Sequence, residues 1–182
     1  AEAERARLYS ELAAQARTFD AVLSASPDQF YLLDADGRCR YVSRAGLEWL
    51  QLSAVAASGR TLFELGLPPD AAAGCEAARL RTSGGGGLSV HEVDLSGPHG
   101  PMSCEALHCG LPDAAGRTGE TLVTVRDITA RKAAERRIRQ LTELYVALSE
   151  TGKAVVRMRG REALFAEVCR IATEHGGLCF AW

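Results

Sequence analysis

The sequence predicts an α+β domain with five strands and with helices at both ends of the chain. The strand candidates have apolar or alternating character and lie at residues 30–33, 39–43, 88–95, 102–111 and 120–126. The first two flank Asp36-Gly37, which suits a tight hairpin turn because glycine adopts positive φ without steric cost. The last strand candidate runs directly into a charged helical segment that begins at Thr129.

Residues 2–25 predict a long N-terminal helix, because they contain no Gly or Pro and are rich in strong helix formers. Apolar side chains recur there at steps of three and four, at Leu8, Leu12, Ala16, Phe19 and Leu23. On a helix outside the sheet such a stripe would stay exposed. We therefore predict a homodimer in which two stripes bury each other or pack on the partner's sheet.

The region between the two strand groups predicts short helices. A short helix is expected over residues 45–52, a single turn over 61–65, and a longer helix from Pro69 to Leu80. A proline in the first helical turn is tolerated, because its missing N–H would have no helical partner there. Gly84 to Gly87 end this helix and lack the lysine of a phosphate-binding loop, so they predict a linker.

The C-terminal third predicts two more helices. The Thr129 hydroxyl is expected to act as N-cap of the first, and Gly152 to end or bend it. Its apolar stripe fits either a coiled-coil seam or the covering of a neighbouring surface, at Ile138, Leu141, Tyr145 and Leu148. Residues 162–174 predict the second helix and 178–182 the start of a strand. These cannot form a core alone, so we expect a truncated second domain.

The composition limits the class of protein. With 182 residues, 47% hydrophobic and 24% charged, the chain resembles an ordinary globular protein. A net charge of −2 gives no attraction to nucleic acid or to an anionic membrane, and no apolar run approaches the roughly 20 residues of a membrane span. Six cysteines without CxxC spacing favour small buried hydrophobes in the reducing cytoplasm over a disulfide or metal framework.

Five segments in this order and spacing resemble the PAS family of sensor domains across about residues 27–128. They are Leu33-Asp34-Ala35-Asp36-Gly37-Arg38, Tyr41-Val42-Ser43-Arg44-Ala45, Gly59-Arg60-Thr61-Leu62-Phe63-Glu64-Leu65, Cys104-Glu105-Ala106, and Val125-Arg126-Asp127-Ile128-Thr129-Ala130-Arg131. Ser43 stands where the family often has Asn, and Gln51-Leu52 where it often has Gly-Tyr. The resemblance implies an antiparallel five-stranded sheet with helices on one face. It also implies a sensory or dimerisation role, with a small-molecule ligand as one input.

The C-terminal segment resembles the first 35 or so residues of a GAF domain. The resemblance rests on Leu148-Ser149-Glu150-Thr151, Arg161-Glu162-Ala163-Leu164-Phe165, Cys169-Arg170-Ile171-Ala172 and Gly176-Gly177-Leu178. It divides the chain into an N-terminal helix (1–26), a PAS domain (27–128), a linker helix (129–151) and the start of a GAF domain (152–182). In bacterial signalling proteins such a pair commonly precedes a diguanylate cyclase or a histidine kinase. The chain has no GxSxG, HExxH or phosphate-loop motif, so it is itself expected not to be an enzyme.

Two histidines are candidate ligands. If residues 88–95 and 102–111 pair as a hairpin, His91 lies nearly opposite Ala106, and His91, Cys104, Ala106 and His108 share one face. A face turned into a cavity would offer an imidazole to haem or metal. A polar sheet surface, or neutral histidines satisfied by hydrogen bonds, explains the same pattern.

A flavin has less support. Trp49 would line a cavity or, more simply, the core, and Cys75 lacks the Asn-Cys-Arg-Phe context of a flavin-adduct cysteine. We therefore predict no cofactor, with haem or flavin as alternatives.

Asp127-Ile128-Thr129 is the predicted signal-transmission junction, since it joins the last strand to the following helix. A carboxylate is favoured near a helix N-terminus, and Arg126 or Arg131 could pair with Asp127. The simpler interpretation is a helix cap. Three functions fit the sequence: a ligand sensor, an interaction module with a collapsed cavity, and a haem- or flavin-bound redox sensor.

Overall fold

The computed structural model describes residues 2–83, 87–97, 100–112 and 118–175, and it divides into two compact units. Ala1–Thr129 forms the first unit and Ala130–Trp182 the second. The helices are α1 (Glu2–Ser24), α2 (Arg44–Leu50), α3 (Ala54–Ala57), α4 (Pro69–Ser83), α5 (Thr129–Arg157) and α6 (Arg161–Glu174). The strands are β1 (Gln29–Leu33), β2 (Cys39–Val42), β3 (Leu88–Gly97), β4 (Gly100–Pro112) and β5 (Thr118–Asp127).

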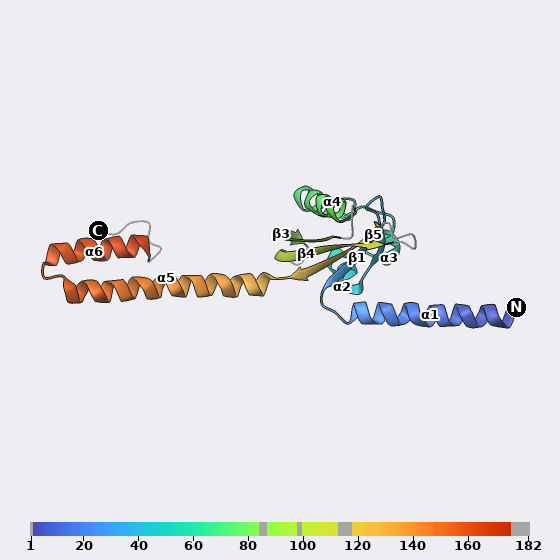
Figure 1. Ribbon diagram of the computed structural model, residues 1–182, viewed down its shortest axis with the longest axis horizontal. Helices are drawn as coiled ribbons and strands as arrows, with labels where there is room; N and C mark the ends of the chain where they lie inside the picture. Colours follow the sequence, from blue (N-terminus) through green and yellow to red (C-terminus); the bar gives the residue numbers. More distant parts are fainter. Residues whose placement is uncertain (1, 84–86, 98–99, 113–117, 176–182) are drawn as a thin grey trace. The chain divides into compact units, whose positions relative to one another are not determined.

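The first unit is built on one five-stranded sheet in the order β2-β1-β5-β4-β3, with every neighbouring pair antiparallel (Figure 1). The predicted α+β class and antiparallel sheet are confirmed. The β3–β4 register places His91 opposite Ala106, as the strand alternation predicts. The first and last strands, β1 and β5, are central neighbours in this sheet.

The β1–β2 hairpin turns where the sequence predicts it. Gly37 has φ +76°, and its backbone N–H donates to the Asp34 carbonyl at 3.0 Å. The Asp34 carboxylate accepts hydrogen bonds from the backbone N–H groups of Asp36 and Arg38, both at 2.9 Å. The aspartate and the glycine together satisfy the backbone of this turn.

Helix α4 covers the inner face of the sheet (Figure 1). Its buried apolar side chains are all small: Ala71, Ala72, Cys75 and Ala78. Small side chains allow a helix backbone to approach a sheet closely, and the larger core residues come from the strands and from residues 62–67. The core therefore lies between α4 and the strands.

Arg79 connects α4 to the β1–β2 turn. Its side chain, 7% exposed, donates to both oxygens of the Glu76 carboxylate at 2.8 and 2.7 Å and to the Ala35 carbonyl at 2.8 Å. A Cβ on Gly37 would lie 3.2 Å from the Arg79 and Glu76 side chains, so the turn packs directly on this ion pair. The hydrogen bonds compensate the burial of the guanidinium group.

The second unit contains α5 beyond Thr129 and α6. Ala154 and Ile171 are its buried side chains among the described residues. The predicted stripe on α5 is exposed, at Ile138, Leu141, Tyr145 and Leu148. None of the described helices combines the length and the apolar character needed to cross a membrane.

One predicted boundary was wrong and one helix was missed. Of the two outcomes predicted for Gly152, the end of the helix is wrong: Gly152 lies inside α5, which continues to Arg157, since one glycine costs a helix only about 1 kcal/mol. The short helix α3 was not predicted, because four residues give no readable period. The predicted strand over 178–182 and residues 84–86 of the predicted linker lie outside the described residues.

We predict that Gly46→Ala lowers the free energy of unfolding of the first unit by about 1–3 kcal/mol, through overpacking. The new Cβ in α2 would lie 2.7 Å from Val42 Cγ1 and 3.2 Å from the Tyr31 ring. Gly74→Ala in α4 is the matched control: its Cβ would lie 3.9 Å from His91 Nε2, an ordinary contact. The control should be neutral or stabilising. Urea unfolding followed by circular dichroism measures both free energies, and equal effects would contradict the packing explanation.

Candidate functional site

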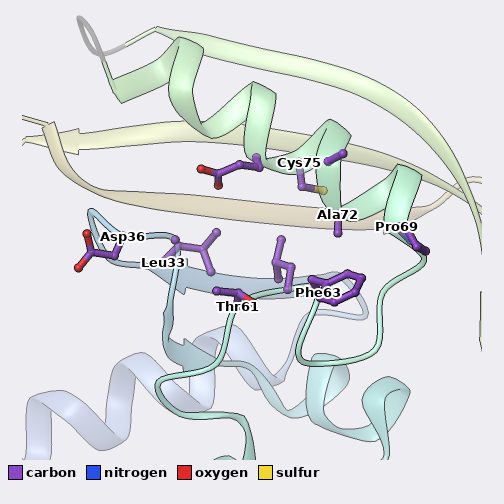
Figure 2. Close-up of a pocket in the computed structure, with 11 residues that line it drawn as sticks. Leu33, Asp36, Thr61, Phe63, Pro69, Ala72 and Cys75 are labelled. Carbon is purple, nitrogen blue, oxygen red and sulfur yellow. The ribbon is translucent and has the colours of Figure 1, made fainter.

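A cavity of about 370 Å³ opens between α4, the β1–β2 turn and the loop at residues 61–63 (Figure 2). Ala72 and Cys75 extend from α4 towards it, and Leu33 lies on the strand side. Its lining residues are Leu33, Asp36, Gly37, Thr61, Leu62, Phe63, Pro69, Ala72, Ala73, Cys75 and Glu76. Cavities that bind small molecules in proteins start at about 300 Å³.

The cavity is apolar with a few polar groups. The Thr61 hydroxyl donates to Glu64 at 3.1 Å, and Asp36 and Glu76 add carboxylates. Arg79 donates hydrogen bonds to the Glu76 carboxylate, and these bonds lower the pKa of Glu76. Burial raises the pKa of the Cys75 thiol to about 11, so this wall is a neutral thiol rather than a nucleophile near pH 7. The lining suits a small, mainly apolar molecule.

Sequence reasoning did not find this cavity. The predicted ligand residues Trp49, His91, Cys104 and His108 are all absent from its lining. Its walls come from segments at residues 33–37, 61–63 and 69–76, which only the fold brings together. Three features of the sequence could have indicated this cavity: the Asp-Gly turn, the Thr61-Leu62-Phe63 segment and a helix whose inward residues are small.

His91 and His108 lie where the strand alternation predicts, on the inner face of β3 and β4 with Cys104 and Ala106. Their rings stack, with centroids 5.2 Å apart and planes 23° apart. Among the described residues no group hydrogen-bonds to any of their four buried ring nitrogens. His108 is fully buried, so the polar-surface alternative is wrong for it, and no described group supplies the hydrogen bonds of the second alternative.

Both imidazoles are held neutral near pH 7. Burial, then His91, then Arg81 lower the pKa of His108 to about 4, and burial and Arg81 also lower the pKa of His91. Within the described parts of the chain, no three His, Cys, Asp or Glu side chains converge as metal ligands.

Trp49 is a packing residue at the other end of β3. A Cβ on Gly97 would lie 2.7 Å from its ring, so the indole covers the glycine backbone. Trp49 also borders an open surface hollow together with Gln29, Met102 and Asp127. The predicted group of Trp49, His91, Cys104 and His108 does not form one site.

The predicted junction Asp127-Ile128-Thr129 is tied to strand β4. The Ser103 N–H donates to Thr129 Oγ1 at 3.0 Å, and the Ile128 N–H donates to the Ser103 carbonyl at 2.8 Å. Ile128 is buried. The Thr129 hydroxyl thus accepts from another strand, and the prediction that it caps its own helix was wrong.

Asp127 supplies the cap. Its carboxylate accepts a hydrogen bond from the Thr129 N–H at 2.8 Å, at the N-terminus of α5. The two arginines proposed as its partners make other ion pairs: Arg126 with Asp28 at 2.8 Å and Arg131 with Glu135 at 3.0 Å.

The stripe on α1 is exposed. Leu8, Leu12 and Phe19 are 52%, 62% and 69% exposed, Ala16 is also exposed, and Leu23 is half-buried. The C-terminal part of α1 is attached to the sheet by the Tyr41 hydroxyl, which donates to Asp20 at 2.9 Å. The stripe is an unoccupied apolar surface within this chain.

Comparison with known proteins places this fold in a family. The sequence profile of the PAS fold matches residues 23–133. Curated protein sequences contain no match to the chain. Among solved structures, the PAS domain of Bordetella pertussis BvgS is 21% identical, with TM-score 0.54, over 71% of this chain and 98% of that one. The Vibrio cholerae VqmA dimer is 21% identical, with TM-score 0.56, over 65% of this chain and 52% of VqmA.

A phage VqmA in complex with DPO is 17% identical, with TM-score 0.58, over 93% of this chain and 84% of that one. The chain spans about half the length of the Vibrio VqmA it matches, and at these identities the likeness concerns the fold. The profile match, in contrast, spans more than half of the chain. The chain belongs to the PAS fold family, with its PAS domain at residues 23–133.

Proposed function

We propose that this PAS domain is a sensory module of a bacterial signal-transduction protein and that it transmits its state to α5 through β4. The observation that carries the proposal is a pair of hydrogen bonds at Ser103 of β4: its N–H donates to the Thr129 hydroxyl and its carbonyl accepts from the Ile128 N–H. Ser103 is next to Cys104, whose side chain is fully buried on the inner face of the sheet. A change in how that face packs can therefore move the start of α5.

The input that fits best is a small molecule in the cavity beside α4. The cavity wall includes Ala72 and Cys75, on the same helix that packs against β4. A ligand that prefers one packing of α4 on the sheet shifts the population of that packing. A balance of a few kcal/mol between two packings is small enough for one ligand to change.

The partner we propose is a second copy of this chain. Support comes from the exposed stripes on α1 and α5, which a monomer leaves in water. We propose no nucleic-acid partner, since the net charge is −2. The Vibrio cholerae VqmA forms a complex with ligand and DNA, but the match to that complex covers only half of VqmA.

The second unit fits the start of a GAF domain, whose inward residue Ile171 is fully buried on α6. We propose that the longer protein is a cytoplasmic signalling protein with an output domain, such as a diguanylate cyclase or histidine kinase, and that this chain itself is not an enzyme.

Two alternatives make different predictions for simple measurements. An interaction module with no ligand would dimerise and bind no small molecule. A haem or flavin sensor would show a Soret band or flavin absorption in stoichiometric amount after purification. We expect neither absorption.

Filling the cavity should abolish ligand binding. Indole is a suitable probe, because it is small, apolar and carries one N–H donor for the carboxylates at the rim. We expect indole to raise the Tm of the wild type and of Ala77→Phe, which alters an exposed position on α4. Ala72→Phe, in the cavity wall, should fold but show no shift. Equal shifts in both variants, or none in the wild type, would contradict an open cavity.

Removing the junction hydroxyl should loosen the junction. Thr129→Val deletes the acceptor for the part-buried Ser103 N–H, a loss of about 0.5–1.5 kcal/mol. Hydrogen exchange at the Ser103 amide should accelerate by about two- to tenfold. Thr142→Val is the matched control, since Thr142 donates to its own helix at Ile138. Unchanged exchange at Ser103 would refute the coupling.

In the full-length protein the double substitution Asp127→Ala, Thr129→Ala should alter basal output at near-normal stability. It removes a cap worth about 1 kcal/mol as well as the bond to β4. Output identical to the wild type would mean that the junction is only a helix cap. Outright unfolding would show that these residues are core structure.

The chain should be a homodimer of about twice 19.4 kDa in light scattering at tens of micromolar. Leu12→Glu combined with Phe19→Glu should yield a folded monomer. Dimerisation through the α1 stripe would bury the two new carboxylates without a counter-charge, which is strongly unfavourable. Val55→Glu is the control: Val55 is 89% exposed on α3, outside the stripe. A wild type that is monomeric at this concentration would refute the dimer.

A further inference from the structure

The stacked histidines occupy a position between α4 and the edge of the sheet. In the β3–β4 register Ser89 faces His108 and His91 faces Ala106, so the two imidazoles are diagonal neighbours on the inner face. A Cβ on Gly74 of α4 would lie 3.9 Å from His91 Nε2. The ring of His91 therefore reaches the helix at a position without a side chain.

The two imidazoles are polar, and no described group forms a hydrogen bond with either of them. A neutral imidazole carries one N–H donor and one acceptor nitrogen. His108 is fully buried, and neither ring has a hydrogen-bond partner among the described residues. Burial of a polar group without a partner is unfavourable, and Leu or Phe would fill this space without that cost. Such groups in native proteins call for a role other than packing.

The charges around the pair oppose a proton on it. Arg81 of α4 donates to Ser89 Oγ at 3.1 Å and acts on both rings, and each histidine faces the other. The other titratable groups on the inner face include Cys75 of α4, Cys104 of β4 and Tyr31 of β1. Burial raises the pKa of Cys75 and of Tyr31, so these two remain neutral and provide no counter-charge. The inward residues of β5 beside them, Thr121, Val123 and Val125, do not titrate.

We propose that His91 and His108 form a proton-sensitive contact, and that protonation of the pair releases α4 from the sheet. A proton on either ring would place a positive charge in the core, beside Arg81 and 5.2 Å from the second ring. The protein can relieve this charge by letting water reach the rings, which requires α4 to move away. The element that moves is the same helix that Arg79 ties to the β1–β2 turn.

A proton fits this pair better than a metal ion does. Imidazole lone pairs lie in the plane of the ring, so two rings stacked face to face do not direct them at one point. No third His, Cys, Asp or Glu completes a cluster among the described residues, and the charged group that acts on both rings is a cation. A divalent ion there would also be an uncompensated buried charge.

The direction of the pH effect follows from the lowered pKa values. An unfolded or released histidine titrates near 6.5, above the values in the packed state. Above about pH 6.5 both histidines are neutral in either state, and α4 packs on the sheet with its full stability. As the pH falls from 6.5 towards about 4, where His108 titrates in the packed state, the packing of α4 becomes weaker. In this window the equilibrium constant for packing falls by up to about tenfold per pH unit for each histidine.

Hydrogen exchange of the α4 amides and urea unfolding of the full chain at pH 7.5 and 5.0 test the proposal. In the wild type we expect the protection factors of α4 amides, which are corrected for the intrinsic exchange rate at each pH, to fall at least tenfold more between pH 7.5 and 5.0 than those of β1 and β5 amides. His91→Leu combined with His108→Leu should remove this difference, and His175→Gln, outside the PAS domain, should retain it. Arg81→Gln gives a second variant that leaves the buried side chains in place. It removes a cation that opposes a proton on the packed pair, so acid should weaken the packing of α4 less than in the wild type.

Three results would overturn the proposal. One is a double variant that keeps the wild-type pH dependence. Another is an NMR titration in which His108 protonates near pH 6.5 while the α4 amides stay protected. The third is stoichiometric zinc, copper or nickel in the purified wild type that the double variant lacks, since this would make the pair a metal site.

Discussion

The packing of α4 on the inner face of the sheet is the contact on which the rest of the domain depends. It closes the core, forms one wall of the cavity and covers the two histidines. The inward side chains of α4 are small, so each buries little apolar area. Apolar burial therefore stabilises the packing of α4 less than it would stabilise a helix with inward leucines. Arg79 compensates in part, by joining α4 to the β1–β2 turn through Glu76 and the Ala35 carbonyl.

Strand β4 combines two environments that are relevant to signalling. Ala106 and His108 face α4 in the core. Further along the same strand, the Ser103 backbone holds the start of α5 through hydrogen bonds to the Ile128 N–H and the Thr129 hydroxyl. A strand is stiff along its length because its neighbours on both sides hydrogen-bond to it, here β3 and β5. A displacement at one end of β4 is therefore transmitted to the other more readily than through a loop.

The sequence predicted those features that depend on local pattern. Strand alternation predicted that His91 lies opposite Ala106 and that Cys104 and His108 share their face, because the period of two is fixed by the backbone. The Asp-Gly turn and the proline at the start of α4 were correct for the same reason. The cavity was not predictable, since Leu33, Phe63 and Ala72 meet only in the folded chain. The prediction for the Thr129 hydroxyl was wrong because its partner, Ser103, lies 26 residues away and is not visible in the local pattern.

The pairing of β1 with β5 has a consequence for how the domain is made. The first and last strands of the sheet are central neighbours, and Asp28 just before β1 forms an ion pair with Arg126 of β5, 98 residues along the chain. The middle of the sheet thus cannot close until the last strand has been synthesised, and a pairing between such distant segments slows folding. The same closeness of the two ends allows the domain to be inserted between other segments, or repeated in tandem, without disturbing its sheet.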